Sequence, residues 1–366
     1  MVVALALDNN YAFAGGSGGG RVDICVFGAV FVVRPAFNLD LTSVLFTSAS
    51  SDAAGVGKSA ATAGGGYTPL ATPAAARKIT FLDKTISTPE LTLISNALDF
   101  NYSVTPATSA PGASSAEKLV SGFLYNGTAD VYAKYANTGT NPNGSFNARP
   151  ASDGTGHELH IFSEEANDHL YSDFASESVD FTFTMNNGTV EDLTLTSNSA
   201  FALNNSSIAL EASKTFDQVW SLANGSVLDA FSATAFTPSS LNVRGKDNTI
   251  TGDLTTNGGA LNFYLPGGID NNDTLLTVTG NANIGGSAVN LALDGGNNLT
   301  TLAATNKITL LNAAGGLTTG YTSGTTSLTA TVGTAFTYNF KLSDDGKNNL
   351  YATLDSKTSP LLPPPQ

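Results

Sequence analysis

Apolar and polar residues alternate along most of this chain, from about residue 78 almost to its end. The clearest alternation places four apolar side chains two positions apart, at Val179, Phe181, Phe183 and Met185. Because successive side chains of a β-strand point to opposite faces, this run predicts a strand with one buried and one solvent-facing side. The Asn-Asn-Gly sequence at 186–188 predicts a tight turn into a second strand that contains Leu193 and Leu195.

Shorter alternating runs follow in the last third of the chain, with clusters of Gly and Asn between them. These runs cover 261–265, 276–278, 289–293 and 308–310. Successive runs are about 13 to 19 residues apart, which is shorter than the roughly 30 residues of a β-α-β unit and leaves no room for interleaved helices. The spacing predicts an all-β fold, a right-handed parallel β-helix with rungs of about 20 residues, apolar inside and with Thr and Asn ladders outside. The alternative is a β-sandwich of two sheets, which would need antiparallel hairpins throughout.

The end of the chain predicts a closing element. Apolar residues alternate over 336–342, turn residues occupy 344–346, and a second alternating run covers 350–354. Such a hairpin would cap the exposed edge of an open solenoid. Four prolines within 360–366 cannot continue a sheet, so this tail is predicted to be a linker.

The composition divides the chain into four parts. They are an irregular Gly/Ala/Ser-rich segment at 1–77, β-helix rungs at 78–235, the C-terminal β-helix with its cap at 236–359, and the Pro-rich linker at 360–366.

In two of these parts, the alternation of apolar and polar residues is less regular. In the first part, strands are expected near 24–33 and 39–46. In the second, an excursion from the coil is expected near 105–175, because 114–125 and 163–174 are compatible with short helices.

Composition and charge narrow the function classes. Charged residues make up 13% of the chain, about half the roughly 25% of ordinary soluble proteins, which disfavours long exposed helices. The net charge of −14 argues against nucleic acid or an anionic membrane surface as a partner. Cys25 is the single cysteine and excludes an intramolecular disulfide. The apolar run around it, 22–33, is too short for a transmembrane helix, which needs about 20 residues.

Five phrases in the last third carry a family resemblance. They are Leu-Asn-Val-Arg-Gly at 241–245, Asn-Thr-Ile-Thr-Gly-Asp-Leu at 248–254, Gly-Gly-Ala-Leu-Asn-Phe-Tyr-Leu-Pro at 258–266, Leu-Leu-Thr-Val-Thr-Gly-Asn-Ala-Asn-Ile-Gly-Gly at 275–286, and Lys-Ile-Thr-Leu-Leu-Asn-Ala at 307–313. Together they resemble the C-terminal part of the passenger domain of bacterial autotransporters, the type V secretion proteins. The resemblance covers about residues 235–315.

The resemblance implies a function at the cell surface. A passenger is exported across the outer membrane through a β-barrel translocator, so this partner and a signal peptide are expected to be missing from this chain, as in a fragment. The expected role is adhesion or binding, with a host or matrix glycan or protein as partner, or structural projection from the cell. The resemblance also implies that the C-terminal rungs promote folding during secretion. The alternative function is a secreted β-helical polysaccharide lyase or hydrolase.

The three histidines are the candidates for a metal site. His157, His160 and His169 lie within thirteen residues of one another, beside several carboxylates. The zinc-protease pattern needs His-Glu-x-x-His, and here the second histidine comes one residue early. If the segment 157–162 is a strand, the first two rings point to opposite faces. A solvated acidic loop is therefore expected in place of a metal centre.

No other motif predicts a catalytic or cofactor site. The segment 53–59 resembles a phosphate-binding loop, but Asp52 stands where the first glycine is required. The Asx-rich segments 270–273 and 343–346 lack the spacing of calcium loops and are expected to be turns. The Gly-x-Ser-x-Gly match at 15–19 lies in a glycine cluster without the strand-then-helix context of a nucleophile elbow, and repeated Asp/Arg pairs at rung spacing are missing from the sequence, so we expect neither catalysis nor a cofactor.

Overall fold

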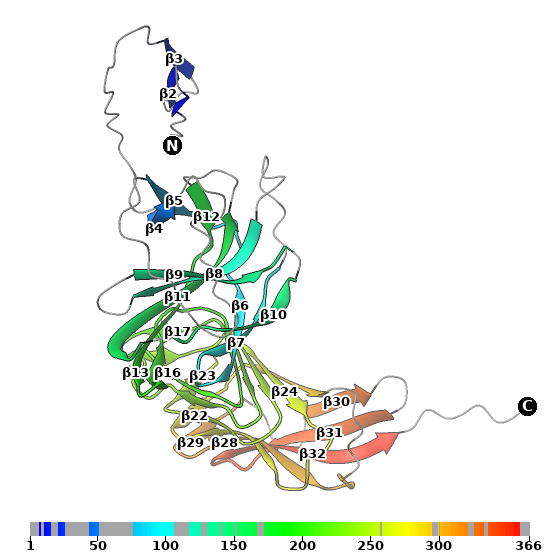
Figure 1. Cartoon of the computed structure of the whole chain (residues 1–366). Helices are drawn as coiled ribbons and strands as arrows, with labels where there is room; N and C mark the ends of the chain where they lie inside the picture. Colours follow the sequence, from blue (N-terminus) through cyan, green and yellow to red (C-terminus); the bar gives the residue numbers. More distant parts are fainter. Residues whose placement is uncertain are drawn as a thin grey trace, which may run out of the picture. The chain divides into compact units, whose positions relative to one another are not determined.

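The computed structural model describes four short strands before residue 51 and most of the chain from 76 to 358 (Figure 1). The gaps after residue 76 are 106–116, 126–129, 140, 151, 167–171, 257, 295–298, 300, 321–325 and 333–335. The predicted linker at 360–366 and the segment 53–59 lie outside the described residues. Contacts divide the chain into two units, 1–44 and 45–366. All regular structure in the described residues is β-strand.

The first unit contains a small antiparallel sheet. Its strands are β1 (Leu7–Asp8), β2 (Tyr11–Gly15) and β3 (Arg21–Cys25). Strand β3 reaches only the beginning of the strand expected near 24–33. Strand β4 (Val44–Ser50), whose residues from Leu45 on belong to the second unit, overlaps the end of the strand expected near 39–46. The stretch between β3 and β4 lies outside the described residues.

Parallel strands form the centre of the second unit. The first series consists of β15 (Phe201–Asn204), β18 (Val219–Ala223), β21 (Ser240–Arg244), β24 (Ala260–Leu265) and β27 (Ala288–Leu293). The second series consists of β16 (Ser207–Leu210), β19 (Val227–Asp229), β22 (Asn248–Thr251), β25 (Thr274–Val278) and β28 (Lys307–Ala313). Shorter strands form two further parallel groups, β17 (Thr215–Phe216) with β20 (Ala235–Phe236), and β23 (Leu254–Thr255) with β26 (Asn281–Asn283) and β29 (Gly316–Thr318).

The chain visits these groups in a fixed order and then returns to the first. Phe263 therefore pairs in parallel with Val243 of the preceding strand in its sheet and with Leu291 of the following one. The fold is all-β with long parallel sheets, an arrangement that is compatible with the predicted solenoid. An antiparallel sandwich does not describe residues 201–318.

Antiparallel strands precede the parallel series. They are β6 (Glu90–Ser95), β7 (Asp99–Ser103), β8 (Glu117–Tyr125), β9 (Asp130–Asn137), β10 (Asn143–Asn147), β11 (Gly154–Ala166), β13 (Val179–Asn186) and β14 (Thr189–Leu195). These strands join the two parallel series, because β6 pairs in parallel with β15 and β14 pairs in parallel with β16. At the far edge, β12 (Ser172–Ala175) pairs in parallel with β5 (Ala76–Leu82). The antiparallel strands occupy the region of the expected excursion and extend beyond it.

The expectation of short helices at 114–125 and 163–174 was wrong. Strand β8 covers the described part of the first segment, and β11 and β12 cover those of the second. Strands β8 and β11 pair antiparallel from Glu158↔Tyr125 to Ala166↔Glu117. Residues 161–165 of β11 are all buried, so both faces of this strand are covered and the apolar alternation is lost. A long ladder with burial on both faces outweighs the helix propensity of the Glu and Ala residues, because tertiary packing overrides intrinsic propensity.

Both predicted hairpins are confirmed. At the first turn, Asn187 and Gly188 have φ values of 49° and 72°, the left-handed pair that a type I′ turn requires. At the end of the chain, β31 (Phe336–Asp344) and β32 (Asn349–Thr358) pair antiparallel, and β30 (Thr326–Val332) extends the hairpin. Strand β32 also pairs antiparallel with β28, so the hairpin covers the last strand of that parallel series.

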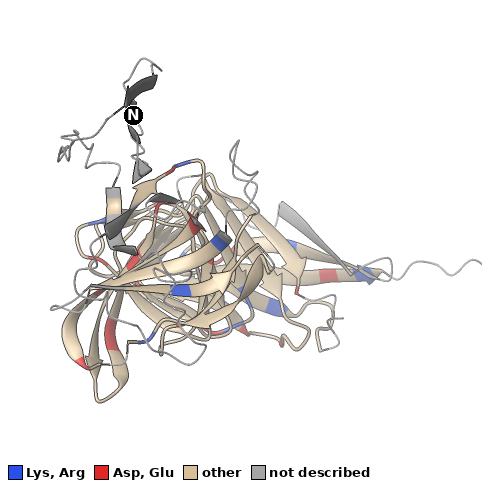
Figure 2. Cartoon of the chain, turned by 45° about the horizontal axis from the view of Figure 1, so that its top comes forward, with Lys and Arg blue, Asp and Glu red and all other residues tan. Residues whose placement is uncertain are grey.

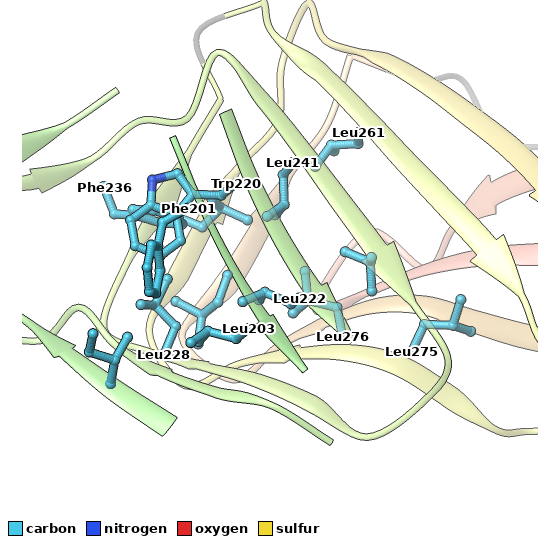
Figure 3. Packing of buried hydrophobic residues seen from close by; sticks show 14 of the residues in the cluster. Phe201, Leu203, Trp220, Leu222, Leu228, Phe236, Leu241, Leu261, Leu275 and Leu276 are labelled. Carbon is cyan, nitrogen blue, oxygen red and sulfur yellow. The ribbon is translucent and has the colours of Figure 1, made fainter. Parts of the chain in front are cut away.

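The core consists of side chains stacked from one parallel strand to the next (Figure 3). Trp220 pairs with Phe201 on one side and with Leu241 on the other, and all three side chains are buried. Its ring lies 5.8 Å from that of Phe201 and 5.4 Å from that of Phe236, both in edge-on geometry. Each fully buried large apolar side chain contributes about 1.5–3 kcal/mol, and aromatic pairs add to this value.

Backbones approach closely at one corner of the repeat. Gly280 donates its N–H to the carbonyl of Gly252 and accepts one from Gly315, each at 2.9 Å. A Cβ atom at position 280 would lie 2.5 Å from the carbonyl oxygen of Gly252. The corner therefore requires glycine, which explains some of the glycine residues in the turns between the strands.

Candidate functional site

The structure separates the two described histidine candidates. His157 and His160 lie on β11 and point to opposite faces, as the strand interpretation requires; His169 lies outside the described residues. His157 is buried and stacks on Phe183 with ring centroids 5.1 Å apart. In the described part of the chain, no group of three or more His, Cys, Asp or Glu residues is arranged to hold a metal ion.

The two imidazoles have pKa values shifted in opposite directions. Burial lowers the pKa of His157, while the backbone of Gly154 acts the other way and is outweighed. A hydrogen bond between His160 Nδ1 and Asp180 Oδ1, at 2.7 Å, raises the pKa of His160. Charge is therefore disfavoured on His157 and favoured on His160.

These shifts predict opposite pH responses of stability. A raised folded pKa contributes stability that is present below the unfolded pKa of about 6.5 and is lost as the pH rises through the folded pKa. His160→Gln is therefore expected to lower the free energy of unfolding more at pH 5 than at pH 8, by at most about 1 kcal/mol because the pair is partly exposed.

The folded pKa of His157 is lowered, so the contribution of His157 to stability is present above about pH 6.5 and is lost as the pH falls toward the folded value. His157→Phe is expected to cost less at pH 5 than at pH 8. Urea unfolding at both pH values checks this, and responses of the same sign would contradict it.

The two Asx-rich segments are turns whose carboxylates have protein partners. Asp345 accepts the backbone N–H groups of Lys347, Asn348 and Asn349 at 2.9 to 3.0 Å. Burial works to raise the pKa of Asp345, but these bonds and the side-chain amide of Asn349 outweigh it and hold the pKa well below its usual range. Asp273 similarly accepts the N–H of Asp270 at 2.8 Å and pairs with Lys246 at 3.2 Å.

An asparagine ladder lies on the outward side of the first parallel series. Asn262 donates to Asn242 Oδ1 at 2.9 Å, and Asn290 donates to Asn262 Oδ1 at 2.8 Å. Asn242 in turn donates to Ser221 Oγ at 3.0 Å. These four residues occupy equivalent positions in β18, β21, β24 and β27. Neighbouring strands are about 4.8 Å apart, so the ladder presents polar groups at regular intervals.

A cation–aromatic pair flanks this ladder. The guanidinium carbon of Arg244 lies 3.9 Å from the ring centroid of Tyr264, its neighbour in the register. Arg244 Nη1 also pairs with Asp294 Oδ1 at 3.0 Å. We call the ladder together with Arg244 and Tyr264 the ladder face.

The ladder face suits recognition and offers no acid–base pair. Side-chain amides both donate and accept hydrogen bonds, and an aromatic ring can stack on the apolar face of a sugar. The sequences of β18, β21, β24 and β27 contain no Asp or Glu. Charges are sparse over the described strands in general (Figure 2). Hydrolysis of a glycosidic bond normally requires two carboxylates, and the strands of this face supply none.

Sequence reasoning anticipated outward ladders but not the members of this one. The separation is 20 residues from Asn242 to Asn262 and 28 from Asn262 to Asn290. The longer second step, in a chain already rich in Asn, conceals the equivalence. In the sequence, Tyr264 is one residue of the alternating run 261–265, and only the strand register brings it beside Arg244.

The fold defines an all-β protein built on long parallel sheets. Comparison with known protein families, curated proteins and solved structures finds no match for this chain. Among the residues that the structure describes, no helix is long and apolar enough to cross a membrane.

Proposed function

We propose that this chain is a surface-exposed autotransporter passenger fragment, a right-handed parallel β-helix with a C-terminal hairpin cap, and that it acts in adhesion. The five phrases over 235–315 support the family, and the parallel pairing of these same residues supports the solenoid. In this proposal, the outer-membrane translocator is the partner in export, the C-terminal rungs promote folding, and the passenger is displayed outside the cell.

The ladder face is the single observation that carries the adhesion role. It combines repeated amides with a stacked aromatic ring, and lacks carboxylates on its strands. A long polymer with many hydroxyl groups, such as a host or matrix glycan, can follow such a face and make similar contacts at each rung. Individual contacts of this kind are weak, and repetition along one polymer multiplies them.

Two substitutions on the ladder face test this proposal. Tyr264→Ala removes the ring, and Asn262→Ala removes the central amide of the ladder. Each is expected to weaken binding to the best glycan from a glycan array about tenfold, the equivalent of roughly 1.4 kcal/mol. Surface plasmon resonance with the purified chain measures the loss.

Asn312→Ala is the matched control. Asn312 is also a half-buried ladder residue, but it lies on β28 of the other parallel series and donates to Asn349 Oδ1 at 2.7 Å. Binding should be unchanged in this variant. Equal losses in all three variants, or no glycan binding by the parent chain, would contradict the proposal. Release of reducing ends or unsaturated sugars by the parent chain would replace it with the lyase or hydrolase alternative.

A further inference from the structure

His157 is a buried imidazole without a hydrogen-bond partner. Its side chain is fully buried, and neither Nδ1 nor Nε2 forms a hydrogen bond in the part of the chain that the structure describes. The backbone of Gly154 lies beside the ring, but outside hydrogen-bonding geometry. Most buried polar groups are hydrogen-bonded, and an exception needs a reason. A neutral imidazole tolerates this environment, whereas an imidazolium would have two buried N–H donors without acceptors.

The strands around His157 present no charge to the ring. The side chains that share its face on β13 and β14 are apolar: Phe181, Phe183, Met185, Val190 and Leu195. The titratable residues near it on β8, β11, β13 and β14 are exposed or point to the opposite face: Tyr125, Glu158, His160, Asp180, Glu191 and Asp192. Lys118, Glu164 and Glu165 lie at the far ends of β8 and β11. Burial is the main cause of the lowered pKa of His157, and no charged group among the described residues contributes to it.

A second group fastens the same end of β11 to the neighbouring hairpin. Asp153 precedes β11, and its Oδ2 and Oδ1 accept the N–H groups of Asn187 at 3.1 Å and Gly188 at 2.9 Å. These two residues form the left-handed turn between β13 and β14. Shortly after Asp153, the ring of His157 stacks on β13. One carboxylate and one neutral ring therefore hold the tip of the hairpin.

The backbone between these two groups is irregular. The pairing of β11 with β13 skips from Gly154 to His157, while β13 advances by only two residues. Gly156 lies in this bulge with φ of 69°, a left-handed conformation. On the other side, the register with β8 ends at Glu158 among the residues described. Since few ladder hydrogen bonds hold this end of β11, we expect it to open before the rest of the strand.

We propose that residues 153–157, the latch segment, form an acid-sensitive latch on the β13–β14 hairpin. Protonation of His157 gives a cation that has no acceptor on its apolar face, so the ring leaves β13 for water and the latch segment separates from the hairpin tip. Phe183 and Met185, each 3% exposed in the closed form, then become accessible. The parallel series stays folded, since its strands do not pair with β11.

The direction of the response follows from the neutral state of the ring in the fold. The folded pKa of His157 lies below the ordinary value of about 6.5, so its stabilising effect is complete above that value and declines as the pH falls toward the folded pKa. The latch is therefore closed at neutral pH and opens in mildly acidic surroundings. It lies on other strands than the ladder face and does not depend on glycan binding.

Hydrogen–deuterium exchange, measured on peptides by mass spectrometry at pH 5 and pH 7.5, tests the latch. After correction for the intrinsic pH dependence of exchange, amides of 153–157 and 179–190 should exchange at least about tenfold faster at pH 5. Amides of 240–278 should keep their corrected rates, and the emission of Trp220, the only tryptophan, should not shift. His157→Phe keeps a ring on β13 without a titratable group, so it should abolish the acceleration. His157→Leu tests the same point if the phenylalanine variant fails to fold.

Two further variants separate His157 from its neighbours. His160→Gln removes an imidazole on the opposite face of β11 and should leave the acceleration intact. Asp153→Asn weakens the contact with the turn and should speed exchange of 179–190 at both pH values, with the acid response preserved. Equal corrected rates at the two pH values, acceleration that persists in the His157 variants, or acceleration as large in 240–278 would overturn the inference. Loss of the response in Asp153→Asn alone would make the carboxylate the sensor and would overturn it as well.

Discussion

Trp220→Ala is expected to lower the free energy of unfolding by about 3–5 kcal/mol. Trp220 is fully buried, and the rings of Phe201, Phe216 and Phe236 surround it. Truncation removes apolar contacts on several sides and leaves a cavity that stacked strands cannot close, because each strand is held by hydrogen bonds to two neighbours. Urea unfolding followed by circular dichroism measures the change.

Val219→Ala is the matched control for this experiment. Val219 precedes Trp220 on β18 and points outward with 42% exposure. Its truncation should change the free energy of unfolding by less than about 0.5 kcal/mol. Similar losses in both variants would show that β18 does not carry one buried and one exposed face, and would contradict the register described above.

The sequence predicts strands best where one face of the strand is buried and the other faces solvent. The buried and half-buried positions of β13 alternate without exception from Val179 to Met185, and those of β24 alternate over the whole strand. In both strands, the periodicity follows directly from the pleat and needs no knowledge of the partners. The Asn187-Gly188 turn was equally predictable, because few other residue pairs tolerate two left-handed conformations.

The sequence was least informative where burial depends on partners from distant parts of the chain. Residues 161–165 of β11 are buried on both faces, so this part of the strand carries no clear period. A side-chain hydrogen bond brings Asn96 beside Ser207 across 111 residues of chain. Single-residue patterns cannot encode such pairings, and Asn or Asp in this chain looks the same in a turn, in a ladder and in a site.

Asn248 shows how structural and surface asparagines can be confused. In the sequence it is one of many Asn residues near a turn, yet its side chain is fully buried at the beginning of β22. Its Oδ1 accepts the N–H of Ser226 at 3.2 Å, and its Nδ2 donates to the carbonyls of Arg244 at 3.0 Å and Leu275 at 3.2 Å. One side chain thus joins the backbones of three successive parallel repeats.

Asn248→Ala is therefore expected to lower the free energy of unfolding by about 3 kcal/mol, because it leaves buried backbone groups of three repeats without this partner at roughly 1–3 kcal/mol each and some regain water. Asn248→Asp tests the geometry separately: a carboxylate can accept from Ser226 but cannot donate to the two carbonyls, so a loss of at least similar size is expected at neutral pH. Asn283→Ala provides the control, because Asn283 is exposed on β26 and, among the described residues, its side chain bonds only to the N–H of Gly285 two residues away, at 3.1 Å. Chemical unfolding of the three variants measures these differences. If Asn248→Ala were as mild as Asn283→Ala, the buried amide would not link the repeats, and the stacked core would have to hold them in register alone.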